Sequence, residues 1–238
     1  KKLRVFIRSS LKYKITFCFK TTRYKPGGFF DKARLIVLTI HTDFLLQIHD
    51  CSTATIGKTK NIPRAPGSAV IGTENGQVIP NYPGIIANVP ALENSAYGVG
   101  TVNTLPEIDG VTRRIPLIIA SNGKLFPSLS MEVLRVAAGD TTVQIKLAPN
   151  GVEKMRIPKF GPITTDNLGR IWIDWSQQHR SFNLTNLPKN LEGAIVVIGP
   201  TLAGVGNPLP TATGSVWPHD VQASVIGTMI NGVVIQRP

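Results

Sequence analysis

The sequence AIVVIG at residues 194–199 decides the fold class. It is a continuous apolar run, mostly β-branched, that ends in glycine, and this is typical of a strand buried on both faces of a sheet. A long loop rich in Gly, Pro and Thr follows at residues 200–217, and Pro218 then opens a helix that Asn231-Gly232 closes. Residues 233–235 (VVI) can return as a parallel strand. The sequence therefore predicts an α/β fold with a mixed sheet and a strand–helix–strand unit at the C-terminus.

Two Asn-Gly dipeptides predict β-hairpins attached to this unit. Asn122-Gly123 and Asn150-Gly151 each separate two short apolar runs, and Asn-Gly is a strong hairpin signal. Between the hairpins, Ser128 is a favourable N-cap and Gly139 a favourable end for a helix. Residues 170–174 (RIWID) alternate between polar and apolar, as expected for a half-buried strand.

Charge is distributed unevenly along the 238 residues. Residues 1–60 hold 13 Lys and Arg against 3 Asp and Glu, a net charge of +10, whereas residues 61–238 hold 13 against 11, only +2. Both cysteines, Cys18 and Cys51, also lie in the first part. A cysteine-free body suits an oxidising compartment, although many cytosolic domains lack cysteine too. We expect residues 1–60 to be a basic, atypical segment, disordered or not native to the domain, and residues 61–238 to form the folded domain.

Composition excludes several classes of protein. An apolar fraction of 42% and a mean hydropathy of +0.08 describe a globular chain rather than a disordered or multispanning one. The best apolar stretch, residues 35–48, is interrupted by His41 and Asp43 and is shorter than the roughly 20 residues of a membrane span. The basic N-terminal charge could attract nucleic acid, but charge alone gives no specificity, so we expect no nucleic-acid partner.

No arrangement of residues predicts catalysis or a metal site. No serine lies in a G-x-S-x-G context, and His219-Asp220 is explained as the N-terminal cap of a helix, where a carboxylate is favourable. Histidines without the spacing of metal ligands stand at four positions: His41, His49, His179 and His219. We therefore predict a non-enzyme without cofactor or metal.

The glycines of residues 199–206 suggest one alternative function. Such glycines are typical of phosphate loops, but Pro200 removes a backbone donor, and neither G-x-G-x-x-G nor Gly-Lys-Ser/Thr is present. A tight structural loop is the simpler interpretation, although ligands often bind at such strand ends in α/β sheets. A soluble α/β enzyme or nucleotide-binding domain that uses this loop remains the alternative.

The sequence DGVTRR at residues 109–114 predicts a turn that leads into a strand. Because neighbouring side chains on a strand point to opposite faces, Arg113 and Arg114 cannot both serve Asp109. We predict that Asp109 and one arginine form a charge-assisted pair, and that the other arginine is free to meet a ligand or a dimer partner. A turn with ordinary solvated charges is the alternative.

Three stretches occur in an order and spacing that resemble a known family. They are GVGTVN at 98–103 with DGVTRRIPL at 109–117 and FPSLSME at 126–132, then LEGAIVVIGPTLA at 191–203, then VWPHDVQA at 216–223 with INGV at 230–233. They resemble the "G-x-V-N … D-x-D-G-x-x-R-R", "G-x-I-V-x-I-G-x-T-A" and "P-G-x-x-x-H-A" stretches of CHASE2 domains. The resemblance covers about residues 90–236 and extends less closely back to about residue 64.

The chain departs from the family pattern at several positions. Glu107 stands for the first acidic residue of D-x-D-G, while His219-Asp220 and Gln222 stand for the glycine and histidine of the last block. Nothing in residues 1–60 matches the anchor and N-terminal segment that are usual in the family, and the transmembrane helices that usually follow are missing. We therefore expect a fragment of a CHASE2 domain.

The resemblance implies an extracytoplasmic sensor of a bacterial membrane receptor whose output module is an adenylate or guanylate cyclase, a histidine kinase or a phosphodiesterase. It implies that this domain lies in the periplasm or outside the cell and that the receptor is held in the inner membrane by segments absent from this chain. It also implies an unidentified small-molecule or periplasmic ligand and a full-length receptor that forms a homodimer. The candidate ligand-binding residues are Arg113, Arg114 and Thr201. The structural signature that the resemblance gives comprises Asp109, Gly110, Arg114, Gly199 and Ala223.

Overall fold

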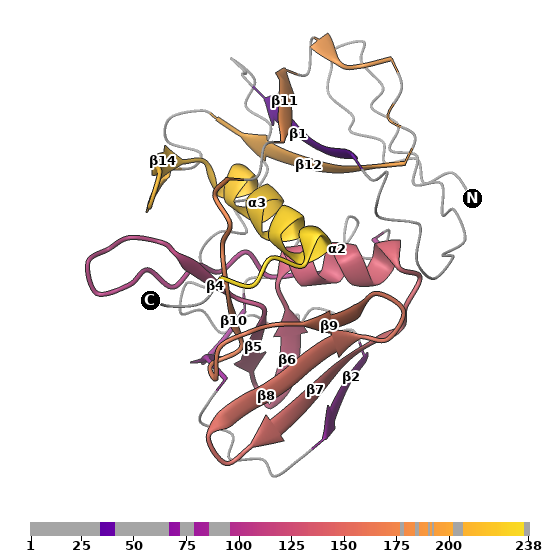
Figure 1. Ribbon diagram of the computed structural model, residues 1–238, viewed down its shortest axis with the longest axis vertical. Helices are drawn as coiled ribbons and strands as arrows, with labels where there is room; N and C mark the ends of the chain where they lie inside the picture. Colours follow the sequence, from indigo (N-terminus) through magenta and orange to yellow (C-terminus); the bar gives the residue numbers. More distant parts are fainter. Residues whose placement is uncertain are drawn as a thin grey trace.

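The computed structural model describes most of the chain from residue 96 onward and three shorter segments before it (Figure 1). The described residues are 34–40, 67–71, 79–85, 96–176, 179–183, 186–189, 191, 193–201 and 207–235.

A parallel three-stranded sheet forms one layer. Its strands lie in the order β11 (Arg180–Asn183), β1 (Arg34–Ile40), β12 (Ala194–Pro200), and β1 pairs in parallel with both neighbours. Helix α3 (Pro218–Asn231) packs against β1 and β12 (Figure 1). This layer therefore joins segments that are about 150 residues apart in the sequence.

Small sheets and helix α2 (Leu129–Ala137) lie on the other side of α3 (Figure 1). One sheet has the order β2 (Gly67–Ile71), β7 (Thr142–Ala148), β8 (Gly151–Ile157), β9 (Gly161–Ile163), and another has β3 (Asn81–Tyr82), β5 (Ile118–Ser121), β6 (Lys124–Pro127). Two antiparallel pairs complete the described strands: β4 (Arg114–Pro116) with β10 (Arg170–Trp172), and β13 (Leu209–Thr211) with β14 (Gly214–Val216). The predicted α/β class is confirmed.

Helix α3 is buried along almost its whole length, from His219 to Met229. A helix that is buried on every side needs other elements packed against each of its faces. Sheet β11-β1-β12 covers one side, and α2 contacts the helix from another. The core cluster accordingly includes Val221 and Ile226 of α3 together with Ile115 and Met131.

The predicted hairpins and helix ends are confirmed. Asn122 and Gly123 have φ values of 50° and 71°, so both adopt the left-handed conformation of a tight hairpin turn between β5 and β6. A second hairpin connects β7 to β8 as predicted, but its turn residues are Pro149 and Asn150, because Gly151 already pairs with Ala148 as the first residue of β8. Ser128 caps α2 by accepting a hydrogen bond from the Met131 N–H, and Gly232, at φ 62°, ends α3.

The C-terminal part of the predicted unit needs correction. Residues 233–235 form no strand, and Val234 is 52% exposed. The parallel partner of β12 is instead β1, which comes from the N-terminal part of the chain. The apolar stretch at residues 35–48 was too short for a membrane span, and its first six residues belong to β1, whose composition, rich in β-branched residues, suits a parallel strand.

Strand β12 and the loop after it also differ from the prediction. Only Val197 and Gly199 are buried on β12, and they share the face toward α3, whereas its other residues are half-buried. The strand stands at an edge of the described sheet, and the residues on its second face are only half-buried. The predicted loop 200–217 contains the hairpin β13–β14.

Strand β1 also bears on the domain boundary that the charge distribution suggested. Residues 34–40 lie within the basic segment 1–60, yet they form the central strand of the sheet. The boundary at residue 60 therefore separates a strand from its own sheet, and this part of the prediction is wrong. The rest of that prediction, for residues 1–33 and 41–60, lies outside the described residues.

We expect a chain shortened to residues 34–238 to unfold cooperatively, and one shortened to 61–238 to lose stability, because only the first keeps the central strand. Urea denaturation followed by circular dichroism compares the two. Equal midpoints for both chains would contradict the role given to β1.

Candidate functional site

A tight turn precedes β4 and holds the predicted Asp109-Gly110 dipeptide. The Gly110 N–H donates to the Glu107 carbonyl at 2.8 Å, and the Glu107 N–H donates to the Val111 carbonyl at 3.0 Å. Gly110 has φ 78°, a conformation that side chains rarely adopt, so glycine is required there. The Val111 N–H also donates to Asp109 Oδ1 at 3.0 Å. These contacts fix the shape of the turn.

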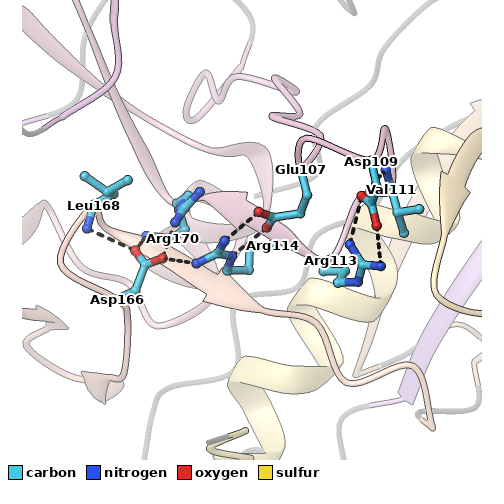
Figure 2. A network of polar contacts seen from close by, with 8 residues as sticks. All are labelled: Glu107, Asp109, Val111, Arg113, Arg114, Asp166, Leu168 and Arg170. Atoms are coloured by element: carbon cyan, nitrogen blue, oxygen red, sulfur yellow. Dashed lines mark hydrogen bonds and ion pairs between the residues drawn. The ribbon is translucent and has the colours of Figure 1, made fainter. Parts of the chain in front are cut away.

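Asp109 and Arg113 form the predicted charge-assisted pair. Both guanidinium Nη atoms donate, to Oδ1 at 3.0 Å and to Oδ2 at 2.7 Å, in a bidentate arrangement (Figure 2). These hydrogen bonds from Arg113, with the one from the Val111 N–H, lower the pKa of Asp109 to about 2. The side chains are 51% and 35% exposed, so solvent screens the pair and it contributes little to stability.

Arg114 makes a second, more buried network on the opposite side. Its Nε and Nη2 donate to Glu107 Oε1 at 2.7 Å and Oε2 at 2.6 Å, and its Nη1 donates to Asp166 Oδ2 at 3.0 Å (Figure 2). The guanidinium also lies over the ring of Trp172, 4.7 Å from the ring centre. Hydrogen bonds with Arg114 lower the pKa of Glu107 and raise that of Arg114 itself.

The carboxylate of Asp166 connects this network to the loop before β10. Its Oδ1 accepts from the backbone N–H groups of Leu168 at 3.0 Å and Arg170 at 2.9 Å, and its Oδ2 accepts from Arg170 Nε at 2.8 Å. Strand pairing places Arg114 directly opposite Trp172. Arg114 therefore ties the turn at residues 107–111 to the loop at 166–170.

This geometry corrects one part of the arginine prediction. Arg113 and Arg114 do point to different partners, as strand alternation requires. The arginine that does not serve Asp109 is not free, however, because all three of its guanidinium nitrogens donate to carboxylates. The sequence missed the partners of Arg114 because Asp166 is 52 residues away, although Glu107 already stood at an acidic position of the motif.

A second group of polar residues lies where β12 meets the first turn of α3. His219 packs against Gly199 so closely that a β-carbon on Gly199 would lie 2.3 Å from His219 Nδ1. Asp220 Oδ1 lies 3.1 Å from His179 Nε2. Asp220 occupies the first turn as predicted, but the N-cap is Trp217, whose side chain makes no capping hydrogen bond. The predicted cap by His219-Asp220 is therefore wrong.

The remaining predicted residues have different surroundings. Ala223 is fully buried in α3, where it belongs to the core. Thr201 is half-buried directly after β12. Residues 202–206 of the loop proposed for nucleotide binding lie outside the described residues. In the described ranges, no three His, Cys, Asp or Glu side chains come together as a metal site would require.

Comparison with protein families matches residues 30–238 to the family described as CHASE2 domain. The fold and these residues thus define a sensing domain, since CHASE2 domains are extracytoplasmic sensors that are not themselves catalytic. The chain belongs to the CHASE2 family. The match begins at residue 30, which places β1 inside the family domain and corrects the expectation that nothing before residue 60 fits it.

Comparison with curated proteins and with solved structures gave no match. Among the helices of the described residues, none has the length and hydropathy needed to cross a membrane.

We expect Arg114→Ala to lower the free energy of unfolding by on the order of 3 kcal/mol, because it removes the cation paired with the half-buried carboxylate of Glu107 and leaves Asp166 with Arg170 alone. Its neighbour supplies the matched control: Arg113→Ala removes an arginine of the same size from an exposed pair and should change stability little. Urea midpoints measure both variants. Equal losses in the two would contradict the structural role assigned to Arg114.

Proposed function

We propose that this chain is the ligand-sensing domain of a membrane-bound signal-transduction receptor. Membership of the CHASE2 family over residues 30–238 is the observation that carries the proposal. The receptor is held in the inner membrane by segments outside these residues, and the domain lies in the periplasm or outside the cell. Its output module is a cyclase, a histidine kinase or a phosphodiesterase in the cytoplasm.

The ligand is a small molecule or a periplasmic component, and Arg113 and Thr201 are the residues we assign to its recognition. Arg113 lies at the rim of the rigid turn, 35% exposed, with only one carboxylate against it. Ile108 stands beside this pair at the tip of the turn and is fully exposed. Arg114 is excluded from direct ligand contact in this proposal, because its nitrogens are already paired.

Two copies of the receptor form a homodimer in which ligand binding to this domain changes the relative position of the subunits. Such a change must pass through a packed element with two arrangements. Helix α3 is the element best suited to this, because it contacts both the parallel sheet and α2.

Screening the purified chain by thermal unfolding against periplasmic metabolites and nucleotides tests the sensing role. We expect a ligand to raise the unfolding temperature by mass action without being converted chemically. We expect Arg113→Ala or Thr201→Val to lower the affinity for this ligand at least tenfold while leaving the stability of the unliganded chain unchanged. Arg156→Ala, which removes an exposed arginine of β8, serves as the matched control.

Micromolar affinity for a nucleotide accompanied by turnover would contradict the proposal and favour the enzyme that uses residues 199–206. Salt-sensitive affinity for DNA that disappears when residues 1–60 are removed would favour a nucleic-acid-binding protein instead.

A further inference from the structure

The first turn of α3 contains a buried histidine with an unpaired nitrogen. The His219 side chain is only 5% exposed, and its Nε2 has no hydrogen-bond partner among the described residues. Buried polar atoms in folded proteins nearly always have a partner, and an exception calls for an explanation. The ring cannot turn away easily, because it lies in the space that a side chain on Gly199 would otherwise occupy.

One carboxylate lies between this histidine and a second one. Asp220 Oδ2 is 3.8 Å from His219 Nε2, and Asp220 Oδ1 is 3.1 Å from His179 Nε2. The Nδ1 of His179 is also buried without a partner. The three side chains come from two segments, the start of α3 and the residue before β11, so they bridge the helix and the sheet.

In the part of the chain that the structure describes, few other charged groups lie on the elements packed against this cluster. The elements packed against α3 are β12, β1 and α2, and β12 contains no titratable residue. On β1 the only such residue is Arg34. It pairs with Ala194, at the end of the strand far from Gly199, which pairs with Thr39. On α2 they are Glu132 and Arg135, which pair with each other. Arg180, next to His179, is exposed.

We propose that His179, Asp220 and His219 form a proton-sensitive latch between the first turn of α3 and the end of β12. In the neutral tautomer that carries its proton on Nδ1, His219 Nε2 and Asp220 Oδ2 are both acceptors, and they lie 3.8 Å apart. A proton taken from solvent onto Nε2 turns this atom into a donor that Asp220 Oδ2 accepts. Closing the gap to hydrogen-bond distance requires a movement of about 1 Å.

That movement changes the contact between His219 and β12. Because the Cβ, Cγ and Nδ1 of His219 are packed against Gly199, a shift of the ring toward Asp220 alters the packing of the first turn of α3 on β12. Helix α3 is buried from His219 to Met229, so its first turn cannot move without affecting its neighbours. Acidity of the surroundings is thereby converted into a change of packing.

Burial lowers the pKa of His219, and Asp220 partly opposes this effect. The unfolded chain, with an ordinary histidine pKa near 6.5, therefore binds more protons than the folded one below that pH. The contribution of neutral His219 to stability is complete above about pH 6.5 and is lost as the pH falls from there through the folded-state pKa. The latch thus responds on the acid side of neutrality.

Nuclear magnetic resonance of the whole chain between pH 8 and 5, with EDTA present to exclude adventitious metal, tests the proposal. We expect the amide signals of Gly199 and Val221 to titrate together with the His219 ring. In Asp220→Asn the ring should titrate at lower pH, because the negative charge that favours the protonated ring is gone, and the amide shifts should be smaller, because a neutral amide oxygen is a weaker acceptor than a carboxylate. In His219→Gln the amide titration should disappear.

Unchanged titration of Gly199 and Val221 in Asp220→Asn would overturn the latch, even if His219→Gln failed to fold. Titration of the ring in the wild-type chain without any amide shift would overturn it as well. Glu153→Gln, which removes a carboxylate from an exposed pair on β8, is the control and should leave every one of these signals unchanged. The proton response does not depend on the receptor role, so failure of the ligand screen would leave this result intact.

Discussion

The burial of α3 is the constraint on which the rest of the structure depends. A helix with no exposed face along most of its length must be covered by elements that the sequence supplies from distant places. One close packing contact and two hydrogen bonds fix its position in addition to apolar packing. His219 lies against Gly199 of β12, Ser130 of α2 donates to the Gln222 side chain, and Thr228 accepts from the backbone N–H of Asp174.

Charged networks fix the turn that precedes β4. Arg114 joins two loops through three carboxylate hydrogen bonds and an aromatic face, so the turn at residues 107–111 has a fixed shape without being part of the core. A rigid turn loses little conformational entropy when it binds a partner, which favours recognition. The pairing also explains why a motif with two adjacent arginines needs two acidic residues: each arginine has its own, Asp109 for Arg113 and Glu107 for Arg114.

Local features of the fold could be predicted from the sequence, whereas distant pairings could not. Ser128 and Asn122-Gly123 act through their own backbone neighbourhood, so residue type was sufficient to place a cap and a hairpin. The parallel partner of β12 was wrongly predicted at residues 233–235. A short β-branched run has the composition of a strand whether or not it pairs with one, and only the long-range pairing identifies β1 as the partner. In the candidate site, the pairing of Asp109 with one of the two arginines could be predicted, whereas the contact of Arg114 with Asp166 could not, because 52 residues separate them in the sequence.

Hydrogen exchange of the backbone amides, measured by mass spectrometry on the whole chain, tests most directly whether one buried helix unites the domain. The account predicts that α3, β1 and β12 exchange together and more slowly than the exposed hairpin β13–β14, because they open only when the domain unfolds. The account is contradicted if residues 34–40 exchange as rapidly as an unprotected chain while α3 remains protected, or if α3 itself exchanges like a loop.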